Sequence, residues 1–382
     1  MKRWGIWLWR VLIGAVIVLA TVLDVAAAGQ ALPDVMYVPE NDELVFRVTA
    51  PAGTATLMLE TPWGRQTQTK IRAQRDGDTW IARFDVSDVP VMAELRYTWM
   101  GIPRQGEPWS TAWVSYNRPD PASDFRVWRH VAGELCDVYG AQLSTAALTQ
   151  IAAAGDAAVR NVRQILGDTA RPVEARPRIV VVVNEWDYAM LATEGGYGVA
   201  KPSWGVTLQW LGHAAIDEFV TRTVPHEIMH LYDPTAERQD VPAWFTEGLA
   251  VLAEGKQTRI ESRQLIRQAA RDETLISACW MGEYPRTDAE TALWYAQALD
   301  MVEALGLEQL RALQAGMTDG TQFLEVWRRV TGETAESWSA IYAQDLLGYR
   351  GRIWIRNALL GIAAVCIALL LYREWLIRNR PE

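Results

Sequence analysis

Hydrophobic and polar residues alternate in short runs between residues 32 and 117, and proline, glycine and aspartate separate the runs. Such alternation places successive side chains on opposite faces of a strand. We therefore expect strands at Leu44–Thr49, Thr54–Glu60, Trp80–Val86, Glu94–Met100 and Trp109–Tyr116. Short strands between turn signals predict an immunoglobulin-like β-sandwich domain over residues 32–117.

The hydrophobic pattern changes after a linker at 118–124, which contains Pro119 and Pro121. We expect strands at Glu134–Tyr139, Arg178–Val183 and Val206–Leu211, and a helix at Thr145–Leu166 with Ser144 as N-cap and Gly167 as its stop. Residues 216–347 have a mainly helical pattern. A small mixed sheet followed by helices predicts an α+β domain at 125–348.

The N-terminal segment predicts export. Lys2, Arg3 and Arg10 precede the apolar run 11–23, and alanines at 26–28 suit a cleavage site, so residues 1–31 are interpreted as a signal peptide. An uncleaved signal anchor is the alternative, because the apolar segment reaches the length of a bilayer span when residues 4–9 are included.

A second apolar run, at 358–372, lies near the other end between Trp354 and Trp375. Tryptophans favour the membrane interface, and the segment that they bracket would be about 33 Å long as a helix. This predicts a transmembrane helix at 353–376 with a cytoplasmic tail to residue 382; a core helix is the alternative. The expected location is the cell membrane, with the folded domains extracytoplasmic and the C-terminal helix in contact with lipid.

Composition narrows the classes of partner. The formal net charge of −9 leaves no basic field to attract a phosphate backbone, so nucleic acid is excluded as a partner. Three cysteines do not make a disulfide framework, although a bridge between Cys136 and Cys279 stays possible.

The candidate chemistry begins with His226-Glu227-Ile228-Met229-His230, an H-E-x-x-H sequence. On a helix the two imidazoles project from one face, where they can share a zinc ion, and Glu227 points beside the metal, where it could act as a general base. A structural pair of histidines is the alternative. Pro225 either starts this helix at His226 or kinks a longer helix begun near Asp217.

A catalytic zinc site needs a third protein ligand. Pro242–Glu254 fits a second helix, with Asp240 as its cap, and it carries Glu247, which follows His230 by 17 positions. Glu254 shares that face and is either a hydrogen-bond partner of a ligand histidine or a solvated helix end.

Together, H-E-x-x-H and W-F-x-E-G-L-A-x-x-x-E-G resemble the gluzincin zinc metallopeptidases, in particular the peptidase MA-like family. The resemblance covers about Asp124 to Leu347 and extends to Trp294–Gly306. It implies one Zn²⁺ per chain with ligands His226, His230 and Glu247, Glu227 as general base, and a peptide or protein substrate. The ligand spacing is slightly shorter than in the thermolysin or aminopeptidase branches, and no aspartate follows Glu247 by four positions as in thermolysin.

The expected reaction is peptide hydrolysis in which Glu227 accepts a proton from a metal-bound water. The developing oxyanion needs a further donor, for which we choose Tyr295 on a helix at 288–305, with Tyr284 and Tyr232 as alternatives. Gly205–Trp210 is the candidate edge strand for an extended substrate. A non-catalytic surface binding or assembly protein that uses the β-sandwich is the alternative function.

Overall fold

The structure is a computed structural model that describes residues 34–344, except for 62–68, 122–125, 173–175, 193–197, 213, 277–280, 283, 286, 336, 339–340 and 343, and also describes residue 367. The chain divides into two compact units, Met1–Pro121 and Ala122–Glu382. The division lies within the stretch 118–124 that the sequence analysis assigned to a linker.

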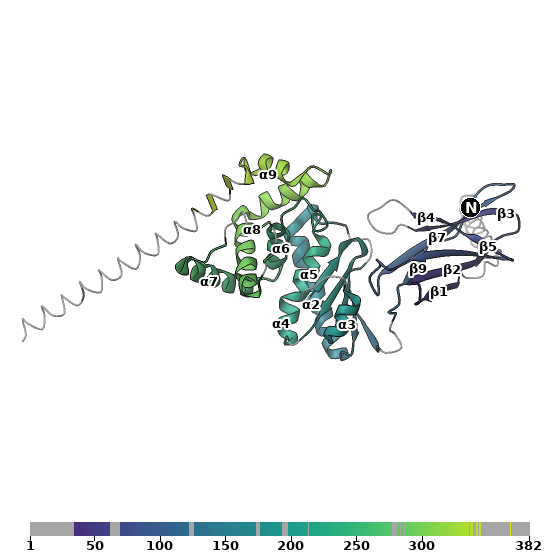
Figure 1. Cartoon of the computed structure of the whole chain (residues 1–382), viewed down its shortest axis with the longest axis horizontal. Helices are drawn as coiled ribbons and strands as arrows, with labels where there is room; N and C mark the ends of the chain where they lie inside the picture. Colours follow the sequence, from purple (N-terminus) through teal and green to yellow (C-terminus); the bar gives the residue numbers. More distant parts are fainter. Residues whose placement is uncertain are drawn as a thin grey trace, which may run out of the picture. The chain divides into compact units, whose positions relative to one another are not determined.

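The first unit consists of two antiparallel sheets (Figure 1). Its strands are β1 (Asp34–Val38), β2 (Glu43–Thr49), β3 (Thr54–Thr61), β4 (Thr69–Arg72), β5 (Gln74–Asp76), β6 (Thr79–Asp85), β7 (Glu94–Pro103), β8 (Trp109–Ser110) and β9 (Val114–Asn117). One sheet has the order β1-β2-β6-β5 and the other β4-β3-β7-β8, with β9 also paired to β7. Two antiparallel sheets packed face to face form a β-sandwich.

Side chains that alternate along the strands fill the space between the two sheets. Leu44, Phe46, Tyr97 and Trp99 are each at most 1% exposed. The rings of Phe46 on β2 and Tyr97 on β7 meet edge to face with centroids 4.8 Å apart, which joins one sheet to the other. The period-two pattern of the sequence therefore becomes an apolar layer.

A five-stranded mixed sheet organises the second unit (Figure 1). Its strands are β10 (Trp128–Ala132), β11 (Asp137–Ala141), β12 (Arg178–Val182), β13 (Gly198–Lys201) and β14 (Val206–Trp210), in the order β10-β11-β12-β14-β13. The pairs β11–β12 and β12–β14 are parallel, whereas β10 and β13 run antiparallel to their neighbours. Every residue of β12 is buried, as expected of a central strand covered on both faces.

Helices make up the rest of this unit. They are α2 (Thr145–Leu166), α3 (Glu185–Leu191), α4 (Ile216–Thr221), α5 (Thr223–Tyr232), α6 (Ala243–Ala253), α7 (Lys256–Asp272), α8 (Asp288–Met317) and α9 (Phe323–Thr331), with 3₁₀ turns at Gly167–Thr169 and Pro202–Trp204. Helix α5 packs against α2, α6 and the strands β13 and β14, and α6 packs against α8. Gly306, at φ 73°, kinks α8.

The prediction for α2 is confirmed at both ends. The Ser144 side chain accepts a hydrogen bond from the amide of Ala147, and Gly167 ends the helix with φ 61°.

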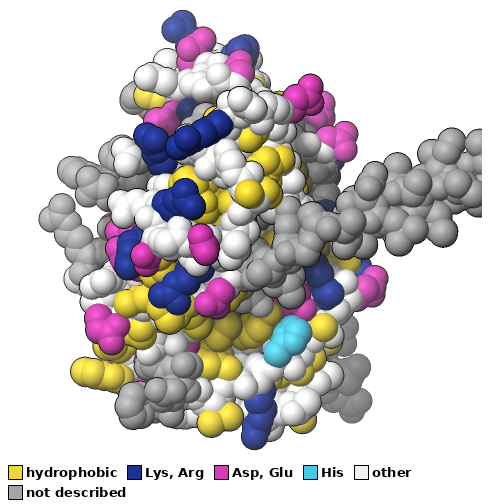
Figure 2. Space-filling model, turned by 90° about the vertical axis from the view of Figure 1, so that its right-hand side faces the viewer, with side chains coloured by type: hydrophobic (Ala, Val, Ile, Leu, Met, Phe, Trp, Pro, Cys, Tyr) yellow, Lys and Arg dark blue, Asp and Glu magenta, His cyan; other side chains and the backbone are white. Residues whose placement is uncertain are grey.

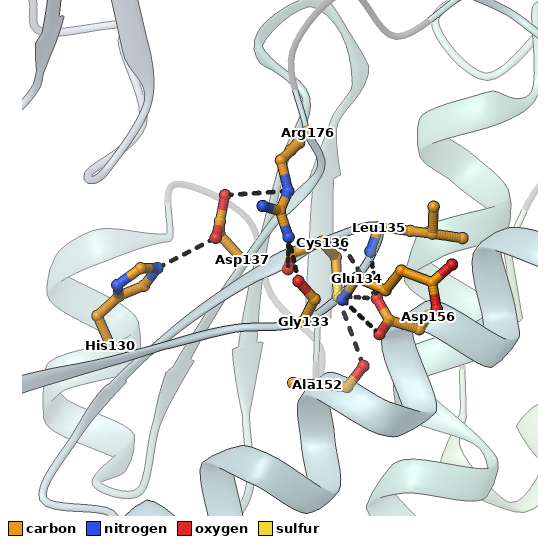
Figure 3. A network of polar contacts seen from close by, with 9 residues as sticks. All are labelled: His130, Gly133, Glu134, Leu135, Cys136, Asp137, Ala152, Asp156 and Arg176. Carbon is orange, nitrogen blue, oxygen red and sulfur yellow. Dashed lines mark hydrogen bonds and ion pairs between the residues drawn. The ribbon is translucent and has the colours of Figure 1, made fainter.

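One turn of α2 also anchors the hairpin between β10 and β11. The Asp156 carboxylate accepts hydrogen bonds from the amides of Glu134 and Leu135, both at 2.7 Å (Figure 3).

One local helix prediction was wrong, and one of two alternatives is supported. Asp240 does not cap α6; Pro242 occupies the N-cap position, while Asp240 pairs with Arg238 and accepts a hydrogen bond from the amide of Phe323. Of the two alternatives for Pro225, the structure supports an interrupted longer helix. Helix α4 begins at Ile216, the helix breaks at Arg222, and α5 follows from Thr223 with Pro225 in its first turn.

The transmembrane part of the fold prediction is corrected. No helix in the described part of the chain is long and apolar enough to cross a bilayer. The expected span at 353–376 lies outside the described residues apart from Ile367, as does the N-terminal segment 1–31.

Figure 2 shows one face of the molecule, on which Lys and Arg side chains alternate with Asp and Glu side chains and with hydrophobic ones.

Candidate metal centre

Helix α5 carries both histidines of the H-E-x-x-H sequence. His226 and His230 are one turn apart, and their ring centroids are separated by 5.0 Å. The other positions of the helix face inward, since Ile228 and Met229 are fully buried. Because α5 is packed on its neighbours through these apolar positions, the imidazoles are held on a fixed face.

Helix α6 brings Glu247 to the histidines. It can lie close to α8 because residue 248 is glycine: a Cβ built there would be 2.4 Å from the carbonyl oxygen of Ala298. An aromatic cluster fixes the first turn of α6, since the rings of Trp244 and Trp338 stack with centroids 6.0 Å apart. The close approach at Gly248 and the packing of Trp244 together fix the position of the helix that carries Glu247.

The three side chains form a group that could hold a metal ion. One ligand atom from each of His226, His230 and Glu247 lies within 4.8 Å of the other two. Oε2 of Glu247 is 3.1 Å from Nε2 of His226 and 3.6 Å from Nε2 of His230. Ligand atoms bound tetrahedrally to zinc at 2.0–2.1 Å are about 3.3 Å apart, so these distances suit a shared ion.

A second carboxylate orients His226. Oε1 of Glu254 lies 2.9 Å from Nδ1 of His226, on the side of the ring that faces away from Glu247. The hydroxyl of Thr258 donates to Oε2 of Glu254 at 3.1 Å, which fixes the carboxylate in turn. Such a carboxylate–imidazole pair sets the tautomer of a metal ligand. Of the two interpretations of Glu254, the structure supports the partner of a ligand histidine and not a solvated helix end.

Burial and mutual charge shift the ionisation of the group. Burial lowers the pKa of His226, but the carboxylates of Glu247 and Glu254 raise it by more. The pKa of His226 therefore lies well above its usual value. Burial raises the pKa of Glu247, but the adjacent imidazoles more than offset this and hold it well below its usual range. The Glu247 carboxylate therefore stays ionised beside the two imidazoles.

Glu227 lies beside this group and is almost completely buried. Burial raises the pKa of Glu227, although the neighbouring histidines lower it in part. Strand β13 approaches the carboxylate so closely that a Cβ built on Gly198 would be 2.4 Å from its Oε1. A buried carboxylate with a raised pKa suits a proton acceptor that later returns the proton.

The three candidate tyrosines have different surroundings. The hydroxyl of Tyr284 donates to Oε1 of Glu247 at 2.6 Å. The ring of Tyr295 lies 6.0 Å from that of His226, so Tyr295 is also beside the group. Tyr232 is the last residue of α5, and its hydroxyl is approached by Arg163 of α2 at 3.4 Å. The contact of Tyr284 with Glu247 was missed, because no sequence pattern links the two positions.

The candidate substrate strand needs correction. The segment 205–210 contains β14, which is paired on both sides, by β12 and by β13. At this end of the sheet the terminal strand among the described residues is β13, which lies beyond β14 in the sheet but precedes it in sequence. The sequence could not show this order because strand neighbours are set by packing.

Cys136 is a free, buried cysteine.

Comparison with known proteins adds little to this description. No protein-family model matches the sequence, and no curated protein is similar to it. One solved structure, the crystal structure of a Br derivative of BhCBM56, aligns with 23% of this chain and 98% of its own length, at 13% identity and a TM-score of 0.20. A TM-score this low does not establish a shared fold. The interpretation of the site therefore depends on its own geometry.

Proposed function

We propose that this chain is a zinc-dependent metallopeptidase of the gluzincin type, with one zinc ion held by His226, His230 and Glu247. The observation that carries the proposal is the convergence of these three side chains, from two helices, beside the buried carboxylate of Glu227. The resemblance of the two sequence motifs to the peptidase MA-like family points to the same chemistry.

The donor set supports zinc. Two imidazole nitrogens and one carboxylate oxygen form a set that catalytic zinc sites use, whereas Ca²⁺ and Mg²⁺ prefer oxygen ligands alone. The carboxylate of Glu254 on the far nitrogen of His226 is the kind of contact that orients metal-bound histidines. Three protein ligands also leave one position open for water or substrate.

The arrangement of the chain suits hydrolysis. A zinc ion in this site would lower the pKa of a bound water toward about 7 and polarise a carbonyl group. Glu227 would accept a proton on its carboxylate and pass it to the departing amine, and burial raises its pKa, as suits a general base. Tyr295 is retained as the proposed oxyanion donor because its ring lies beside His226.

A terminal strand supports an extended peptide as substrate. No described strand pairs with the outer edge of β13, and Gly198 of that strand is in contact range of Glu227. Strand addition at a sheet edge aligns a peptide by its backbone, whatever its side chains. A peptide added to β13 would therefore run past the proposed base.

The purified chain loaded with zinc, incubated with a mixed peptide library, tests the proposal. We expect cleavage that a zinc chelator abolishes and that added zinc restores. Glu227→Gln should keep its zinc and lose at least about 100-fold in rate, since general-base catalysis contributes a factor of about 10² to 10⁴. Zinc-loaded chain without chelator-sensitive cleavage would contradict the proposal and favour a binding protein.

A further inference from the structure

Tyr284 lies in the segment that connects α7 to α8. It is an exposed residue whose hydroxyl forms a hydrogen bond with a buried carboxylate. The residue is 58% exposed, yet its hydroxyl reaches Oε1 of Glu247, a residue that is only 6% exposed. The ring stacks on Trp294 of α8, with centroids 5.6 Å apart and an interplanar angle of 26°. Trp294 is itself buried, so it offers a fixed surface against which the tyrosine is held.

The two oxygens of Glu247 have different partners. Oε2 faces the imidazole nitrogens at 3.1 and 3.6 Å, and Oε1 accepts the hydrogen bond from Tyr284 at 2.6 Å. A carboxylate without a partner on its second oxygen could rotate or bind a metal ion through both oxygens. Oε1 therefore already accepts a hydrogen bond from Tyr284, and Oε2 is the oxygen that lies next to the two histidine nitrogens.

We propose that Tyr284 is a positioning residue that fixes Glu247 as a ligand through one oxygen. This inference rests on the metal centre of the proposed function. Ligating carboxylates are commonly held by such hydrogen bonds, and their loss lowers metal affinity about 10- to 100-fold. Single-oxygen ligation also keeps the fourth coordination position open, which the hydrolytic reaction requires. Tyr284 thereby acts on the metal through Glu247 and not on the substrate.

The variant Tyr284→Phe removes the hydroxyl and keeps the ring that stacks on Trp294. The control is Tyr342→Phe, since the hydroxyl of Tyr342 also donates to a carboxylate of the same unit, Oδ2 of Asp300, at 2.9 Å. Zinc affinity of the full chain is measured by competition with a chromogenic chelator, without any substrate. Replacement of zinc by Co²⁺ adds a visible spectrum that reports the geometry around the ion.

We expect Tyr284→Phe to bind zinc about 10- to 100-fold more weakly and to change the Co²⁺ spectrum, whereas Tyr342→Phe matches the wild type in both. Zinc affinity within twofold of the wild type and an unaltered spectrum would overturn the inference. Unchanged affinity with a reduced kcat would also overturn it, because Tyr284 would then act on the substrate. Failure of the wild type to bind zinc overturns the inference and the proposed function together, whereas zinc-loaded wild type without peptidase activity overturns the proposed function alone.

Discussion

Replacement of Gly198 by alanine tests the contact between strand β13 and the proposed base. A Cβ at this position would be 2.4 Å from Oε1 and 2.6 Å from Cδ of Glu227, whereas ordinary contacts of a Cβ are 3.4 Å or longer. The backbone at Gly198 does not have a positive φ, so the effect of the methyl group is steric alone. The carboxylate or the strand must therefore move by about 1 Å, and a displacement of about 1 Å at a reacting group can lower the rate about 100-fold.

The assay compares kcat and zinc affinity of Gly198→Ala with those of the wild type. We expect kcat on a cleaved peptide to fall about 100-fold, while zinc affinity stays unchanged, because the nearest atoms to the new methyl group belong to Glu227 and not to a metal ligand. Gly282→Ala is the matched control: a Cβ there meets no atom within 4 Å, and its φ is not positive. This control should retain full activity.

Two results would contradict this prediction. If Gly198→Ala retains kcat within about twofold of the wild type, either the strand yields without cost or the position of the Glu227 carboxylate does not limit the rate. If Gly198→Ala loses zinc, the strand supports the metal ligands and not the base. In both cases Gly198 would not be needed to give the Glu227 carboxylate the position that the reaction requires.

Two further predictions concern the ligands and the fold. His230→Ala should lose zinc, measured by elemental analysis of the purified chain, because one of three protein ligands is removed; undiminished zinc would exclude His230 as a ligand. Asp156→Ala should lower the free energy of unfolding by about 2 to 4 kcal/mol, since it leaves the amides of Glu134 and Leu135 without their acceptor. Burial raises the pKa of Asp156, but these amides hold it below the usual 3.8, so its contribution is present above that pH and is lost as the pH falls through the folded-state value. Chemical denaturation of both proteins at neutral pH and near pH 3 checks the sign: a difference that grows on acidification would contradict it.

The sequence predicted best those features that depend on neighbouring residues. Both ends of α2 follow from Ser144 and Gly167, whose side chain and backbone act within one turn. The histidine pair follows from a spacing of four on a helix. Glu247 was also named correctly as a member of the group, because the W-F-x-E-G sequence lies on a second helix that follows His230 after a short loop.

The features that the sequence did not predict depend on contacts between distant segments. Asp240 has the composition of a helix cap, but Arg238 and the amide of Phe323 compete for its carboxylate. Strand β13 has only four residues, and its place at the end of the sheet is decided by pairing with β14, a strand that comes later in the chain. Short strands of this kind have too few side chains to show a period.

Glu247 illustrates why such a site needs support from several segments. A buried carboxylate next to two imidazoles is costly unless each oxygen has a partner. Oε2 is directed at the histidines, Oε1 accepts a hydrogen bond from Tyr284, and the helix that carries Glu247 reaches them only because Gly248 lets α6 approach α8. A cation shared by the three side chains would be attracted by the Glu247 carboxylate and bound by the lone pairs of neutral imidazoles. Because both oxygens already have partners in the folded chain, part of the ordering cost of this carboxylate is met when the chain folds.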